Sequence, residues 1–195
     1  MPMPSAADAR TLIRRAWTLR CETLTASTAS EAEARAVAEK VRGYLVEAIA
    51  ICRAAGADRE LVTALGKLGH VEQDAGRHDA ARVCFEEAVA AARTVADPLQ
   101  LAHAVRHLGD VHRHARRLAA AEACYEEALS LYGRHAAGAA TLDHANALRP
   151  MAILKEESGQ VEEARMLWGS ARELYGAAGI EAGVAECTDH LDRLG

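Results

Sequence analysis

Apolar residues recur along this chain at helical spacing and are separated by short polar breaks. Between residues 59 and 75 the apolar positions stand three or four apart, as at Leu61, Leu65 and Leu68. The polar sequence 76–79 interrupts the pattern, and a second stripe of the same spacing follows it. The same pattern predicts helices over residues 5–25, 31–55, 59–75, 79–95, 98–115, 118–134, 139–158, 161–176 and 181–194.

The helix pattern repeats with a period of about forty residues. Residues 64–71 match residues 104–111, and Phe85 corresponds to Tyr125 at the same offset. A third copy follows, in which Trp168 occupies the aromatic position. Repetition at this period predicts stacked helix hairpins, because one hairpin alone cannot bury both of its faces. We expect a single helical-repeat domain over 1–195, composed of a degenerate N-terminal hairpin (1–57), repeats at 58–97, 98–137 and 138–180, and a C-terminal capping helix (181–195).

Small and aromatic residues hold fixed places in each copy. The small residues are expected to let the two helices of a hairpin approach closely. These residues are Gly69, Ala81, Gly109, Ala121, Ala152 and Ala164. The aromatic side chains Phe85, Tyr125 and Trp168 are expected to fill the space between neighbouring hairpins.

These positions resemble the tetratricopeptide repeat family. In two copies a Leu-Gly pair in the first helix precedes a small residue, an aromatic residue and Ala in the second: Leu68-Gly69 with Ala81, Phe85 and Ala88, and Leu108-Gly109 with Ala121, Tyr125 and Ala128. The period exceeds the family's usual 34 or so and is similar to the longer repeats of kinesin light chains and bacterial regulators. The resemblance implies an all-α, right-handed α-solenoid of about nine helices in antiparallel hairpins. It also implies a non-enzymatic scaffold for protein–protein interaction.

Composition and charge narrow the classes of partner. The formal net charge of −5 lacks the basic footprint of a nucleic-acid-binding protein. No apolar run is long enough to span a membrane, and the first residues do not resemble a signal peptide, so we expect a cytoplasmic protein without membrane contact. The five cysteines form no CxxC pair, which argues against structural zinc. We expect no cofactor and no metal.

In proteins of the resembled family, the first helix of each repeat lines the concave surface. The positions predicted to line this groove and contact a partner are His70, Gln73, His103, Arg106, Asp110, Arg113, His114, Asn146, Arg149 and Lys155. The middle of this set is basic within an acidic chain, so it suits an acidic peptide or a chain-terminal carboxylate. The alternative is a solvated surface without a partner.

Two further hypotheses remain open. His103 and His107 lie four residues apart on one predicted helix, and with His70 and His114 they suggest a ligand or metal sensor. However, His107 aligns with Lys67 at a position expected to be solvated, and no HExxH motif is present. The chain could instead self-associate as a homodimer through apolar surface at its ends. It has no phosphate-binding loop or GxSxG motif, so we do not expect an enzyme.

Overall fold

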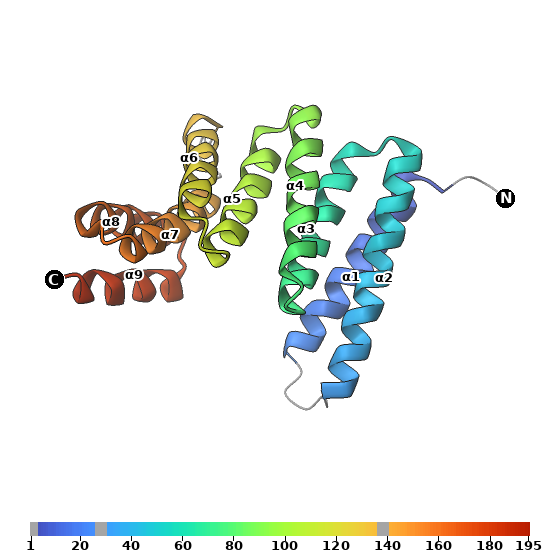
Figure 1. Cartoon of the computed structure of the whole chain (residues 1–195), viewed down its shortest axis with the longest axis horizontal. Helices are drawn as coiled ribbons and strands as arrows, with labels where there is room; N and C mark the ends of the chain where they lie inside the picture. Colours follow the sequence, from blue (N-terminus) through green and yellow to red (C-terminus); the bar gives the residue numbers. More distant parts are fainter. Residues whose placement is uncertain (1–3, 26–30, 136–140) are drawn as a thin grey trace. The chain divides into compact units, whose positions relative to one another are not determined.

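The computed structural model describes residues 4–25, 31–135 and 141–195, and within these ranges the elements of regular structure are all helices, joined by short turns (Figure 1). The helices are α1 (Ala6–Thr25), α2 (Glu31–Ala55), α3 (Asp58–Asp74), α4 (His78–Val95), α5 (Pro98–His114), α6 (Leu118–His135), α7 (Thr141–Glu157), α8 (Val161–Ala177) and α9 (Glu181–Arg193). Their bounds differ from the predicted ones by no more than two residues. Residues 138–140, with which the third predicted repeat begins, lie outside the described residues. The all-α prediction is confirmed.

A recurring tight turn ends the helices. After α3, Gly76 has a φ of 71°, and after α5 the non-glycine Arg116 takes the same left-handed conformation at 59°. The backbone N–H of Arg77 then donates to the carbonyl of Glu72 at 2.8 Å, and that of Arg117 donates to His112 at 2.9 Å. These bonds satisfy carbonyls that the helix end leaves open, so each hairpin can reverse direction within a few residues.

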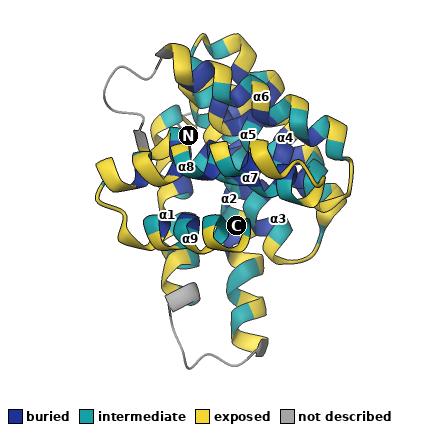
Figure 2. Ribbon diagram, turned by 90° about the vertical axis from the view of Figure 1, so that its left-hand side faces the viewer, coloured by how far each residue is buried: buried dark blue, intermediate teal, exposed yellow. Residues whose placement is uncertain are grey.

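The chain divides into two compact units, and each is described by itself. Residues 1–97 hold α1 to α4, in which the hairpins α1/α2 and α3/α4 pack through contacts of α3 with α2 and α1. Residues 98–195 hold the hairpins α5/α6 and α7/α8, with α9 packed on α8. In both units the buried positions line the helix faces that meet, and exposed positions cover the outside (Figure 2).

In both complete Leu-Gly repeats the glycine of the first helix lies against the aromatic ring of the second helix. A Cβ atom added at Gly69 would lie 2.6 Å from the Phe85 ring, and one at Gly109 would lie 2.6 Å from the Tyr125 ring. Each ring therefore lies between the two helices of its own hairpin, a contact that the sequence analysis, which placed the rings between neighbouring hairpins, did not predict. Tyr125 also packs with Met151 and Leu154 of the following hairpin.

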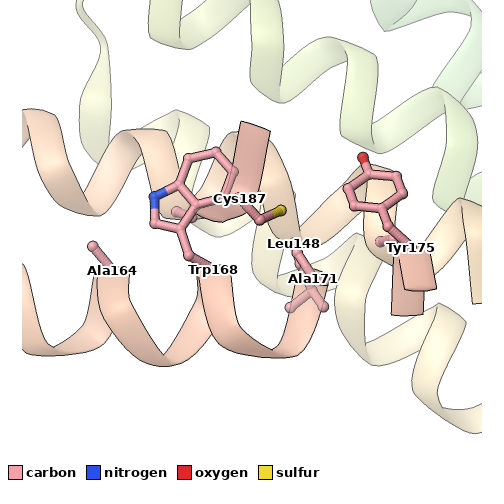
Figure 3. Close-up of a cluster of buried hydrophobic side chains, with 8 residues drawn as sticks. Leu148, Ala164, Trp168, Ala171, Tyr175 and Cys187 are labelled. Atoms are coloured by element: carbon pink, nitrogen blue, oxygen red, sulfur yellow. The ribbon is translucent and has the colours of Figure 1, made fainter. Parts of the chain in front are cut away.

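Helix α9 completes the core of the last hairpin. Trp168 is fully buried, and Cys187 of α9 belongs to the same apolar cluster, as Figure 3 shows. The ring of His190 stacks on Trp168 with centroids 4.0 Å apart. The Trp168 indole N–H and His190 Nδ1 both meet the carboxylate of Glu156. One apolar contact and one polar contact therefore fix α9 against α7 and α8.

Candidate functional site

The structure distributes the predicted groove residues over three helices in two units. His70 and Gln73 lie on α3 in the first unit, whereas the remaining residues lie on α5 and α7 in the second. The two sets are therefore described separately. Within the second unit, α5 and α7 are in direct contact.

Asp110 is the centre of a polar cluster on α5. The hydroxyl of Tyr125 donates to its Oδ1 at 2.9 Å, and His107 Nδ1 lies 3.2 Å from its Oδ2. The guanidinium of Arg106 lies one helical turn away, with Nη1 3.6 Å from the same oxygen. Burial alone would raise the pKa of Asp110, but the bond with His107 and the charge of Arg106 outweigh it and lower that pKa. Asp110 is thus held as a carboxylate.

His107 corrects one prediction from the sequence. It was expected to be solvated, but it is only 9% exposed. Its Nε2 lies 2.7 Å from Arg106 Nη2, while its Nδ1 faces Asp110. Burial lowers the pKa of His107 to about 4, because the imidazolium loses hydration that the neutral ring does not need. His107 is therefore part of the folded core and its two nitrogens are already engaged.

Arg149 and Asn146 lie on α7 and are oriented by the helices that follow. Arg149 donates hydrogen bonds to the Glu186 carboxylate of α9 from Nε at 2.8 Å and from Nη2 at 2.6 Å. These bonds raise the pKa of Arg149. The hydroxyl of Tyr175 donates to Asn146 Oδ1 at 2.9 Å. The negative charge of Asp110 also acts on Arg149.

The structure therefore brings four of the predicted residues together. We call the surface formed by Arg106, Asp110, Asn146 and Arg149 the α5/α7 face. All four side chains are partly exposed.

Lys155 does not lie on this face. It was predicted to line the groove, but it is only 5% exposed. Its Nζ lies 2.8 Å from Glu163 of α8 and also pairs with Glu122 of α6. The ammonium group thus faces the second helices of two hairpins, and the prediction that Lys155 lines the groove is wrong.

The remaining predicted residues of α5 lie near its ends. Arg113 Nη1 pairs with Glu157 of α7 at 2.7 Å, and this carboxylate also meets Arg116 at 3.1 Å. His114, beside Arg113, is exposed, as is His103 in the first half of the helix. These contacts tie the end of α5 to α7.

On α3 the predicted residues lie beside an aromatic side chain that the sequence analysis did not identify. His70 packs between Trp17 of α1 and Phe85, with ring centroids 6.2 and 5.4 Å away. Lys67 Nζ lies 3.5 Å from the centre of the Trp17 ring, and burial lowers the pKa of Lys67. Gln73 is partly exposed near the end of α3. Trp17 precedes the well-matched repeats, so the forty-residue pattern did not select it.

These contacts change the electrostatic description of the predicted groove. Arg106, Arg113, Arg149 and Lys155 each lie within 4 Å of a carboxylate oxygen. The basic patch expected from the sequence is therefore balanced by acidic side chains. These acidic side chains lie up to 44 residues along the chain from the cations they pair with, as Glu157 does from Arg113.

The part of the chain that the structure describes contains no cluster of side chains arranged to bind a metal ion. Across these residues no group of three or more His, Cys, Asp or Glu side chains is placed to hold a metal ion. The rings of His103 and His107 are 4.5 Å apart at their centroids, in an edge-to-face contact. Over the same residues, none of the helices combines the length and apolar character needed to cross a membrane.

Comparison with known proteins agrees with the helical-repeat fold. The sequence profile of the tetratricopeptide repeat family matches residues 61–98 and 101–137. These two segments carry tetratricopeptide repeats. Repeats of this family form scaffolds for protein–protein interaction. No curated protein sequence matches the chain.

Solved structures share the fold of this chain at low sequence identity. BtubC (BKLC) from P. vanneervenii is 18% identical with a TM-score of 0.64, covering 97% of this chain and 89% of its own. RapI in its apo form is 10% identical with a TM-score of 0.78, covering 93% of this chain and 60% of its own. A kinesin light chain-like protein from Podosopora anserina, with nearly identical TPR-like repeats, is 12% identical with a TM-score of 0.66, covering 97% and 95%. At these identities the likeness concerns the fold.

Proposed function

We propose that this protein is a non-enzymatic scaffold that holds a polypeptide segment against the α5/α7 face. The observation that carries this proposal is the convergence of Arg106, Asp110, Asn146 and Arg149 on neighbouring first helices. Contacts from α6, α8 and α9 orient these side chains, so little conformational entropy is lost when a peptide binds.

The chemistry of the face suits a peptide backbone. Arg149 bonds Glu186 through Nε and Nη2, which leaves the N–H groups of Nη1 as donors, and its side chain is 43% exposed. Glu186, 35% exposed, offers acceptor capacity beside it. An extended peptide presents both N–H and C=O groups, and donors and acceptors placed side by side can bind both.

The pairing of basic and acidic side chains on the α5/α7 face changes the kind of peptide we expect it to bind. Arg106 and Arg149 are offset by Asp110 and Glu186, so the α5/α7 face has no net excess of positive charge among these four groups. An acidic peptide would compete with carboxylates already in place. We therefore propose that this face binds a peptide of mixed polarity, in place of the acidic peptide expected from the sequence.

A charge reversal with a matched control tests this assignment. Peptides are first selected from a random display library on the wild-type protein, then synthesised with a fluorescent label. Arg149→Glu places a carboxylate beside Glu186 and is expected to weaken binding about tenfold or more. Arg172→Glu makes the same charge change at an exposed position of α8 and is expected to leave binding unchanged.

Circular dichroism establishes that both variants keep the helical fold. Equal binding by the Arg149→Glu and Arg172→Glu proteins would show that the selected peptides dock elsewhere, and the assignment of the α5/α7 face would then be wrong. Equal loss in both would attribute the effect to net charge, with the same consequence.

A further inference from the structure

A cleft lies between α1 and α2, and most of its charged lining residues are cations. Its volume is about 430 Å³. The lining includes Arg14, Arg15, Thr18 and Glu22 of α1 and Lys40 and Tyr44 of α2. We call it the α1/α2 cleft. Three cations and one carboxylate therefore surround it, and the carboxylate, Glu22, lies at the end nearest the C-terminus of α1.

Cations of α1 that point elsewhere are neutralised. Arg10 pairs with Glu60 of α3 at 2.5 Å, and Arg20 pairs with Asp74 of α3 at 2.7 Å. In contrast, no carboxylate among the described residues lies within ion-pair distance of Arg14, Arg15 or Lys40, all of which are exposed. Helical periodicity places positions 15, 18 and 22 on a side of α1 away from Arg10 and Arg20, whereas Arg14, one turn from Arg10, lies at the border between the two sides.

One of these cations is already oriented. The guanidinium of Arg15 lies over the ring of Tyr44, with Cζ 4.8 Å from its centre. A guanidinium stacked in this way keeps its N–H groups at its edge, where they can meet a carboxylate in a two-point bond. The Thr18 side chain, one turn from Arg14, supplies a hydroxyl group on the same wall.

The cleft has the dimensions of a short extended peptide. From Thr11, which also lines the cleft, to Glu22, α1 rises about 17 Å, which corresponds to about five residues of extended chain. Side chains four apart on a helix are about 6 Å apart along its axis, close to the roughly 7 Å between alternate side chains of an extended peptide. Successive carboxylates of such a peptide can therefore meet successive polar groups of the wall.

We propose that the α1/α2 cleft binds an acidic segment of a partner polypeptide through Arg14, Arg15 and Lys40. The acidic partner expected from the sequence is thereby assigned to α1 and α2, away from the α5/α7 face. Charge complementarity selects this occupant. A nucleic acid is a poorer match, because a chain of net charge −5 repels a long polyanion outside a patch of three cations.

Fluorescence anisotropy with a defined probe tests the proposal. The probe is a fluorescein-labelled peptide of alternating Glu and Ser, about ten residues long so that it exceeds the cleft. Alternating Gln and Ser provides the uncharged comparison. The wild-type protein is expected to bind the Glu-Ser peptide and not the Gln-Ser peptide, with an affinity that falls as salt is raised.

Matched variants locate the binding. Arg14→Gln/Lys40→Gln is expected to weaken Glu-Ser binding about tenfold or more, and Arg15→Gln to weaken it in the same direction. Arg35→Gln removes an exposed cation of α2 outside the cleft and is expected to change the affinity by less than about twofold. Because all four residues are exposed, the thermal unfolding of the variants is expected to match the wild type.

Several results would overturn the proposal. The wild-type protein could fail to bind the Glu-Ser peptide, or the double variant could bind it as tightly as the wild type. An equal loss in the Arg149→Glu protein would place the acidic peptide on the α5/α7 face instead. Tighter binding of a single-stranded oligonucleotide or of anionic vesicles, lost in the double variant, would assign the cleft to a different class of partner.

Discussion

Burial of His107 makes the stability of the second unit sensitive to mild acid. The pKa of His107 is lowered to about 4 by burial, with the charges of Arg106 and His103 acting in the same direction and Asp110 opposing them. In the unfolded chain the imidazole has its ordinary pKa of about 6.5. Below that pH the unfolded state binds a proton that the folded state excludes until the pH reaches about 4.

The magnitude follows from these two values. Between pH 7 and pH 5, protonation of the unfolded chain lowers the free energy of unfolding by about 2 kcal/mol through His107 alone. The loss grows as the pH falls from 6.5 toward 4 and is absent at neutral pH. Replacement by Gln removes the titration while keeping an amide that can donate to Asp110. His107→Gln is therefore expected to abolish most of this pH dependence.

The chain offers a selective assay, because its two tryptophans lie in different units. Trp17 belongs to the first unit and Trp168 to the second. In a Trp17→Phe background, fluorescence-detected urea unfolding reports the second unit through Trp168. The free energy of unfolding is measured at pH 7 and pH 5 with His107 and with Gln at that position.

His114→Gln, an exposed position on the same helix, is the matched control and is expected to retain the parent's pH dependence. His144, whose pKa is also lowered by burial, is present in every protein and cancels in the comparison. If His107→Gln loses as much stability between pH 7 and pH 5 as its parent, then burial of His107 is not the cause and the reasoning is refuted.

Three other predictions concern packing and buried charge. Gly109→Ala forces a Cβ against the Tyr125 ring and is expected to lower the free energy of unfolding by about 1–3 kcal/mol. Gly133 has open space around it, so Gly133→Ala is expected to raise the free energy of unfolding by up to about 1 kcal/mol. Urea unfolding measures both, and the opposite ranking of the two variants contradicts the packing of Gly109 on Tyr125. Glu72 is 2% exposed, and burial alone would raise its pKa, but bonds from two arginines lower it. Glu72→Gln is expected to destabilise the first unit by about 1–3 kcal/mol at pH 7. Below about pH 4.5 the loss is expected to be smaller, because the ionised wild-type carboxylate then stabilises the folded state less. Amide hydrogen exchange of α3 measures the effect, and an effect that does not depend on pH argues against this explanation. Lys155→Met is expected to leave binding of the library-selected peptides unchanged, because the Lys155 ammonium group faces α6 and α8. A loss of binding in titrations would indicate that Lys155 contacts the peptide after all.

Residue pairs show where sequence reasoning succeeded and where it did not. The glycine and the aromatic residue of each repeat, sixteen residues apart, could be identified from the sequence, but the contact of Gly69 with Phe85 and of Gly109 with Tyr125 could not, because the rings were expected between neighbouring hairpins. Lys67 and His107 occupy one repeat position and were both expected to be solvated, yet burial lowers the pKa of each. Their neighbours are Trp17 in one unit and Asp110 in the other, which the repeat does not specify.

The sequence alone determined the helices, their period and the places of the small and aromatic residues in each hairpin. These features depend on local spacing that recurs in every copy, so the copies confirm one another. Only the tertiary structure decided which charges remain unpaired. Glu157, Glu186 and Glu122 come from helices 33–44 residues away from the cations they neutralise. Such pairing depends on the rotation and register of packed helices, which a repeat pattern leaves open. It neutralises the cations of the predicted groove, whereas Arg14, Arg15 and Lys40 of the α1/α2 cleft have no carboxylate at ion-pair distance among the described residues.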